Sequence, residues 1–308
     1  MTTTAFITHR DCMLHDMGEH HPECPSRLNA INDHLIAQGI DAYFDYHEAP
    51  LATLEQMLRA HPPAHIEHLK RSSPEHGVFH LDPDTAMNPY TWRAAQRSAG
   101  AGCFAVDLVM ERKAENAFCA VRPPGHHAER ETAMGFCFLN NIAIAARHAV
   151  QVHGVSRVAI IDFDVHHGNG TESILSGDPN VLMCGIFQHP FYPYSGIEKP
   201  AENMCNVPLP GGSGGEEFRD AVSQVWLPRL EAFRPELILV SAGFDAHYED
   251  DMGGMKLVEK DFAWVTDQLK QLAAKHASKR IVSMLEGGYV LTSLSRSVGA
   301  HLRVLADL

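Results

Sequence analysis

Short apolar runs recur along the chain, and each ends abruptly in polar or glycine-rich sequence. Five of them, each four to six residues long, lack polar alternation: 118–121 (FCAV), 158–161 (VAII), 181–186 (VLMCGI), 237–240 (LILV) and 281–285 (IVSML). Runs of this kind are typical of strands that are buried on both faces, as in a parallel sheet. The pattern therefore predicts five buried strands.

Longer stretches with apolar and small residues at helical spacing lie between these runs. They cover 92–112, 138–153, 216–233 and 260–276. Alternating strands and helices predict an α/β fold in which helices flank a central, mostly parallel sheet. Long linkers, low-complexity segments and internal repeats are not evident, so we expect a single domain over residues 1–308.

Polar clusters follow the predicted strands. They are RPPGHHA (122–128), DFDVHHGNG (162–170), FQHPFYP (187–193), SAGFDAH (241–247) and EGGY (286–289). The carboxyl ends of parallel strands meet at one edge of a sheet, which is where open α/β folds bind ligands. We therefore expect these segments, although distant in sequence, to meet in one cleft.

The charge balance narrows the choice of partner. Against 38 aspartate and glutamate residues stand 25 lysine and arginine residues, which gives the 308-residue chain a formal net charge of −13. That excess argues against a nucleic-acid partner, because such binding depends on clustered cations. It is compatible with a cationic partner, such as a lysine-rich peptide or a polyamine.

Cysteine usage and the first residues bear on the compartment. The seven cysteines form no C-x-x-C pair, which predicts reduced thiols rather than a disulfide scaffold. The opening MTTTAFITHRDC lacks the basic and apolar segments of a signal peptide, and no run approaches the roughly 18 apolar residues of a membrane span. We therefore expect a cytoplasmic protein with no membrane segment.

Three residues in the polar clusters predict a metal site. Asp164 and His166 follow one buried run, and Asp245 follows another. If the first strand continues, Asp162 shares a face with Asp164 and His166, and burial of these groups is costly unless a cation compensates. Three such ligands with an open position are typical of catalytic zinc. The alternative is that they are ordinary polar residues of loops.

Four motifs in this order resemble the histone deacetylase superfamily: RPPGHHA, DFDVHHGNGT, SAGFDAH and LEGGY. The resemblance is greatest to class II, with its bacterial deacetylase-like amidohydrolases, and extends from HHPECPSRL (20–28) to the C-terminus. It implies the three-layer arginase–deacetylase fold. It also implies one zinc ion per chain and hydrolysis of an acyl–amine bond.

The resemblance further implies a catalytic set of metal ligands, two histidines with their partners, and a tyrosine: Asp164, His166 and Asp245; His126 with Asp162 and His127 with Asn169; and Tyr289. Because Asn169 carries no charge, we expect His127 to be less basic than His126 and to accept the proton of the attacking water. Weakly active class IIa members carry histidine where this chain has Tyr289, so the tyrosine predicts a competent deacylase.

Other positions match the substrate channel of the family. Gly135 and Phe136 match the tunnel lining, and Tyr192 matches the aromatic residue that faces it. Met252 stands at the gatekeeper position. Arg27 matches an arginine behind the metal, and Asp84 matches the rim aspartate. Asp82 competes with Asp84 for the rim position, because the alignment there needs a gap.

The family often binds potassium beside the zinc, through Asp162, Asp164, His166 and a serine of the next strand. Gly185 stands at the serine position here, so a potassium site would depend on carbonyl groups.

Several alternatives stay open at this point. The expected substrate is acyl-lysine in peptides or proteins, and the second candidate is an acetylated polyamine. Met252 stands where a polyamine-selective relative has an acidic gatekeeper, which favours lysine, although three acidic residues, 249–251, precede it. A catalytically silent binding module is a third interpretation. Iron instead of zinc, and an oligomer, are also compatible with the sequence.

Among the 21 histidines, those in the N-terminal third, such as His61 and His65, are expected in solvated or loop positions.

Overall fold

The computed structural model describes residues 3–308 and places most of their strands in one sheet. In this range, eight strands in the order β2-β1-β5-β10-β9-β6-β7-β8 each run parallel to their neighbours. Their bounds are Thr4–Thr8 (β1), Phe44–Glu48 (β2), Asn116–Cys119 (β5), Val158–Asp162 (β6), Val181–Gln188 (β7), Met204–Leu209 (β8), Leu237–Ala242 (β9) and Ile281–Leu285 (β10). A small antiparallel ribbon pairs Phe79–His80 (β3) with Ala86–Met87 (β4).

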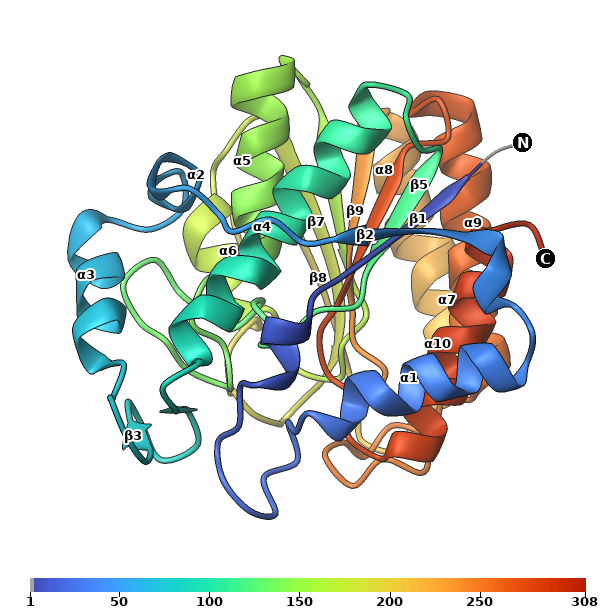
Figure 1. The fold of residues 1–308 in the computed structure, drawn as a ribbon. Helices are drawn as coiled ribbons and strands as arrows, with labels where there is room; N and C mark the ends of the chain where they lie inside the picture. The colour runs from blue at the N-terminus through green and yellow to red at the C-terminus, as the bar shows by residue number, and fades with distance from the viewer. Residues whose placement is uncertain (1–2) are drawn as a thin grey trace.

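Helices cover both faces of the sheet (Figure 1). On one face lie Leu54–Leu58 (α2), Pro63–Ser72 (α3), Thr91–Met110 (α4), Asn141–His153 (α5) and Asn169–Leu175 (α6). On the other lie Ser26–Ala37 (α1), Gly215–Ala221 (α7), Leu227–Phe233 (α8), Glu259–His276 (α9) and Leu291–Leu305 (α10). Short 3-10 turns occupy Arg10–Met13 (η1) and Asp41–Tyr43 (η2). Among the described residues, no helix is long and apolar enough to cross a membrane.

The three-layer α/β architecture with a parallel sheet is confirmed, and the five predicted strands are β5, β6, β7, β9 and β10. Every residue of these strands is buried, which explains why their sequences are unbroken apolar runs. Strands β1, β2 and β8 of the sheet were missed. The apolar part of β1 is only three residues long, and the edge strands β2 and β8 are interrupted by charged residues or by asparagine and proline.

Two expectations, one for a helix and one for a strand, need adjustment. The stretch predicted as one helix over 216–233 consists of α7, a π-helical turn over Val222–Trp226 (η3) and α8. The strand considered to continue through His166, as one condition of the metal-site argument, ends at Asp162. The metal-ligand candidates after it therefore lie on an irregular segment, where side chains can converge more closely than alternate positions of a strand allow.

His61 and His65 are buried, at 1% and 2% exposure. The expected solvated or loop position was wrong for His65, which lies on α3, whereas His61 does lie in the loop between α2 and α3 but is not solvated. The Nε2 atom of His61 accepts a hydrogen bond from the backbone N–H of Asn140, and His65 Nε2 lies 2.9 Å from the carbonyl oxygen of Phe138. Both rings thus connect the α2–α3 region to the segment that precedes α5.

A third buried histidine makes the stability of the fold depend on pH. His301 on α10 contacts Ser283 Oγ at 2.9 Å and Thr266 Oγ1 at 2.6 Å. Burial lowers the pKa of its ring from 6.5 to about 3. The unfolded chain therefore takes up a proton first, and the stability contributed by the neutral ring is lost as the pH falls from 6.5 toward 3.

We expect this loss to have a slope of up to about 1.4 kcal/mol per pH unit. Urea unfolding of the wild type and of His301→Asn, at a series of pH values below neutrality, measures it. The variant should show the smaller slope, and equal slopes for the two proteins would contradict the assignment. Loss of bound metal at low pH affects both proteins and cancels in the comparison.

Candidate metal centre and its cavity

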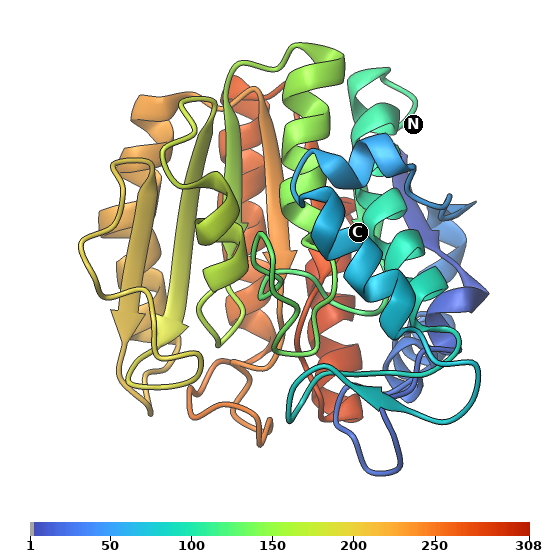
Figure 2. The same cartoon turned by 90° about the vertical axis from the view of Figure 1, so that its left-hand side faces the viewer.

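The candidate catalytic residues follow four neighbouring strands at the centre of the sheet, in the order β5-β10-β9-β6. The strands of the large sheet all point the same way, and the loops after them gather at the lower edge in Figure 2. Apart from Asn169 at the start of α6, these loops carry the catalytic set: His126 and His127 after β5, Tyr289 after β10, Asp245 after β9, and Asp162, Asp164 and His166 at and after the end of β6. The cleft expected from the sequence is therefore formed.

Asp164, His166 and Asp245 meet with their potential ligand atoms within 4.8 Å of one another. The Nδ1 atom of His166 lies 3.0 Å from Asp164 Oδ1 and 3.2 Å from Asp245 Oδ2. All three side chains are buried. Two nearby carboxylates and a ring nitrogen suit a divalent cation such as zinc, and this set leaves a coordination position for water or substrate.

The charges in this cluster fit a bound cation. Burial alone would lower the pKa of His166, but the neighbouring carboxylates of Asp164 and Asp245 outweigh it and raise that pKa to about 10. Burial and the charge of Asp164 raise the pKa of Asp245 to about 7. Among the described residues, the buried Oδ2 of Asp245 has no hydrogen-bond partner of good geometry. The site thus favours positive charge and offers an acceptor atom to it.

Two glycines give the carboxylates their room. A Cβ at Gly243 would lie 2.1 Å from Asp164 Oδ2, and a Cβ at Gly287 would lie 2.0 Å from Asp245 Oδ2. The backbone N–H of Gly287 also donates to Asp164 Oδ2 at 2.9 Å. Any larger residue at these positions would displace a candidate ligand.

The tandem histidines lie beside the cluster, with ring centroids 4.1 Å apart. His126 Nδ1 lies 3.0 Å from Asp162 Oδ2, and His127 Nδ1 lies 2.7 Å from Asn169 Oδ1. Burial would lower the pKa of His126, yet the carboxylates of Asp164 and Asp162 hold it well above its usual value. Burial and the neighbouring His126 and His166 hold the pKa of His127 well below its usual value. The order of basicity is the one that the sequence predicts.

Tyr289 completes the group from the loop after β10. Its backbone N–H donates to Asp250 Oδ2 at 2.7 Å, which fixes the main chain there. Burial, with the charges of Asp245 and Asp164, raises the pKa of the phenol well above its usual value. The hydroxyl therefore stays protonated and can act as a hydrogen-bond donor.

A cavity of about 290 Å³ leads to this group. The residues that line it are Asp84, His127, Gly135, Phe136, His166, Phe191, Tyr192, Asp251, Met252 and Tyr289. The predicted channel residues lie on it except Arg27. Phe191 was not singled out from the sequence, and Asp251 was noted only as one of the acidic residues before Met252. Phe191 stacks on the ring of His166 with centroids 5.4 Å apart, and its place one residue before Tyr192 was the available signal.

Asp82 and Asp84, the two candidates for the rim position, have different surroundings in the structure. Asp82 Oδ1 accepts hydrogen bonds from the backbone N–H groups of Asp84 and Thr85, at 3.0 and 2.6 Å. Asp82 therefore stabilises the turn, whereas Asp84 lines the cavity.

Arg27 lies behind the cavity rather than on its wall. Its guanidinium carbon is 5.0 Å from the ring centroid of Tyr289, and its nitrogens donate to the carbonyl oxygens of Gly288 and Glu286. Its NH1 also pairs with Glu23 at 3.0 Å. A fully buried arginine held in this way supports the tyrosine loop from behind, where the resemblance places it, and its contact with a substrate stays a prediction.

Two buried carboxylates were missed by sequence reasoning. Glu23 bonds both Arg27 and Arg122, and the two arginines are fully buried with it. Glu286 Oε2 accepts from the backbone N–H groups of Gly125 and His126, at 2.7 and 3.1 Å. Both lie inside the resembling motifs, but a sequence does not show which partner a buried carboxylate meets.

The residue beside Asp162 on the neighbouring strand is the glycine that the sequence comparison places at the serine position of the potassium site. Gly185 on β7 is the register partner of Asp162 on β6, so a serine hydroxyl is absent from this point.

Asp107, His148 and His153 also lie close enough together to hold a metal. However, Arg59 NH1 lies 3.0 Å from His148 Nδ1, and because arginine only donates, that nitrogen carries a lone pair. The Nε2 atom of His148 then bears the hydrogen and donates to Asp107 at 2.8 Å. The cluster is therefore explained by hydrogen bonds to the Asp107 carboxylate rather than by a bound metal.

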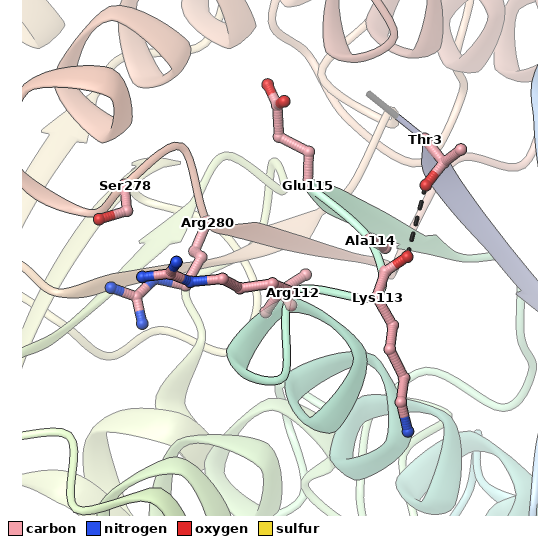
Figure 3. A pocket seen from close by; sticks show the side chains of 8 residues that line it. Thr3, Arg112, Lys113, Ala114, Glu115, Ser278 and Arg280 are labelled. Carbon is pink, nitrogen blue, oxygen red and sulfur yellow. Dashed lines mark hydrogen bonds between the residues drawn. The ribbon is translucent and has the colours of Figure 1, made fainter. Parts of the chain in front are cut away.

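A hollow of about 540 Å³ opens at the amino edge of the sheet, opposite the cavity (Figure 3). Arg112, Lys113 and Arg280 line it together with Glu115. These cations follow the C-terminal ends of α4 and α9, where they offset the partial negative charge of the helix dipoles. Their position is thus explained by the fold.

Comparison with solved structures defines the class. The crystal structure of the HDA15 HD domain superposes with a TM-score of 0.94 and 33% sequence identity, over 100% of this chain and 90% of that one. The fold is therefore of the arginase–deacetylase type. A family model described as histone deacetylase domain matches residues 21–305. The chain belongs to the histone deacetylase family.

Named relatives agree with this assignment. The histone deacetylase-like amidohydrolase of Pseudomonas aeruginosa is 37% identical over 310 residues, which cover 93% of this chain and 81% of that protein. The polyamine deacetylase HDAC10 of Mus musculus is 36% identical and aligns with 98% of this chain, but with only 48% of its own length. The chain is accordingly a hydrolase that acts on amides, and zinc dependence is expected for its family.

Proposed function

We propose that this protein uses zinc to remove acetyl or other acyl groups from the side-chain amine of lysine in peptides or proteins. The observation that carries the proposal is the junction of the Asp164–His166–Asp245 cluster with a cavity that also exposes His127 and Tyr289. The cavity ends at a candidate metal position, a proton acceptor and a hydroxyl donor.

The residues divide the chemistry as follows. Bound zinc supplies polarisation of the acyl carbonyl and lowers the pKa of a coordinated water. His127, the less basic histidine, can take a proton from the attacking water through Nε2 and later deliver a proton to the leaving amine. Asp162 holds His126 through Nδ1. The Tyr289 hydroxyl donates to the oxygen on which negative charge develops.

The walls of the cavity suit a linear aliphatic chain. Phe136, Phe191 and Tyr192 line it with Gly135, and burial of an aliphatic chain against such surfaces is favourable. Asp84 at the same cavity offers an acceptor for the backbone N–H groups of a peptide. Asn169 in place of aspartate supports assignment to class II.

Hydrolysis of acetylated polyamines is the second candidate. Asp251 lines the cavity together with Asp84, so two carboxylates could attract a second amine of the substrate. The similarity to a polyamine deacetylase supports the same candidate. Against it, Met252 rather than an acidic residue lies on the cavity wall.

A direct comparison decides between the candidates. With zinc content measured on the same samples, acetate release should be faster from an acetyl-lysine peptide than from acetylspermidine. A strong preference for acetylspermidine would overturn the lysine assignment. If zinc-loaded protein hydrolyses neither these nor longer acyl-lysine substrates, the silent binding module becomes the better interpretation.

A further inference from the structure

Asn169 connects His127 to a residue that the mechanism does not use. Its Oδ1 lies 2.7 Å from His127 Nδ1, and its Nδ2 donates to Glu129 Oε1 at 2.8 Å. Nδ2 also lies 3.4 Å from the sulfur of Met134. Asn169 is buried, and Glu129 is partly buried on the loop that follows His127. In the described part of the chain, this is the hydrogen bond that the Glu129 carboxylate makes.

The orientation of an asparagine amide is not fixed by its shape, because the oxygen and the nitrogen occupy nearly equivalent positions. A carboxylate, however, only accepts hydrogen bonds. Turning the Asn169 amide over would place its oxygen against Glu129 Oε1, at the 2.8 Å that now separates donor and acceptor. Glu129 therefore keeps the nitrogen on its own side and the oxygen toward His127.

This orientation determines which nitrogen of His127 carries a hydrogen. Facing an oxygen, Nδ1 must be the donor, and in the neutral ring Nε2 then has the lone pair. With the amide reversed, Nδ1 would accept and Nε2 would carry the hydrogen, so the ring could not take a proton from water. An aspartate at position 169 would need no such help, because both of its oxygens accept.

We propose that Glu129 is a positioning residue, which acts through Asn169 to keep His127 Nε2 available as the proton acceptor. The proposal rests on the proposed function, in which His127 has that role. It explains how a neutral asparagine can replace a carboxylate next to His127. The same loop also restricts the position of the His127 ring from another side, because the backbone of Gly135 packs so closely that a Cβ there would lie 2.5 Å from His127 Cδ2.

The test uses two near-isosteric substitutions and their combination, in zinc-loaded protein. Glu129→Gln allows either amide orientation, and kcat should fall about 10-fold with KM nearly unchanged. Asn169→Asp alone places two carboxylates in contact and should also lower kcat. In the double variant the new amide at position 129 can donate to the new carboxylate at position 169, which accepts from His127. Its kcat should therefore return to within about threefold of wild type.

A structural role for Glu129 would not show this rescue. The matched control is Glu131→Gln, two residues further along the same loop and exposed, which should keep wild-type kcat. Wild-type kcat in Glu129→Gln, or a double variant no better than the poorer single one, would overturn the proposal. If instead wild-type protein has no amide-hydrolysing activity on any acyl-amine substrate, the proposed function is at fault.

A second measurement does not depend on turnover. In protein with ¹⁵N-labelled histidine, the ring nitrogen shifts of His127, assigned through a His127→Gln variant, report which nitrogen is protonated. Wild-type protein should carry the hydrogen on Nδ1, and Glu129→Gln should show a mixture of the two tautomers. Protonation of Nε2 in the neutral ring of the wild type would contradict the proposal even if every variant were active.

Discussion

Replacing Asp245 by asparagine should remove both the bound metal and the hydrolytic activity. Asp245 is fully buried, and its Oδ2 lies 3.2 Å from His166 Nδ1 in the candidate site. The amide is a much poorer ligand than the carboxylate. If each protein ligand contributes about 3 kcal/mol to binding of zinc, loss of one weakens binding about 100-fold. Competition with a chelator, followed by metal analysis and an acetate assay, measures both effects.

The fold of this variant should survive. The backbone N–H of Val165 donates to Asp245 Oδ1 at 2.9 Å, and the asparagine oxygen can accept the same hydrogen bond. A thermal melt of the metal-free proteins provides the check. Asp267→Ala, on an exposed position of α9, is the control that should keep zinc and activity. Wild-type zinc affinity in Asp245→Asn would refute the assigned ligand set.

Replacing Tyr289 by phenylalanine should separate catalysis from metal binding. The variant keeps the ring, which packs edge-on against Phe136 with centroids 5.8 Å apart, and lacks only the donor. Loss of one oxyanion donor typically lowers kcat about 100- to 1000-fold. Zinc content and KM should change little, because the hydroxyl acts mainly in the transition state.

Tyr248→Phe is the comparison for this prediction. Tyr248 is exposed and its hydroxyl donates to Glu249, so its loss should leave kcat as it is. Equal kcat values for wild type and Tyr289→Phe would show that the charge on the acyl oxygen is stabilised by another group.

The sheet and the metal cluster were predictable for one physical reason. Strands that are buried on both faces must be apolar along their whole length, and β6 and β9 therefore stand out with their polar ends. Parallel strands then bring Asp164 and Asp245 to one edge, without any knowledge of the intervening helices. The edge strand β2 was harder to recognise, because three of its five residues are exposed and it has no continuous apolar run.

Contacts between distant loops could not be predicted in the same way. Asp82 and Asp84 lie two residues apart, and only the closed turn shows which carboxylate caps the backbone and which lines the cavity. Arg27 matched a family position, but its burial against Glu23 and the loop that carries Tyr289 follows from packing of α1. Glu129 offered no pattern, because its effect passes through the orientation of an amide.

The candidate ligands and the cavity walls differ in how they are attached to the fold. The ligands follow strands β6 and β9, which pair with each other in the middle of the sheet. Phe136, Tyr192 and Met252, in contrast, lie on loops that join the elements. Insertions and substitutions are tolerated in such loops far more readily than in a buried sheet. Descendants of this chain could therefore exchange one acylated amine for another while the hydrolytic machinery beneath stays the same.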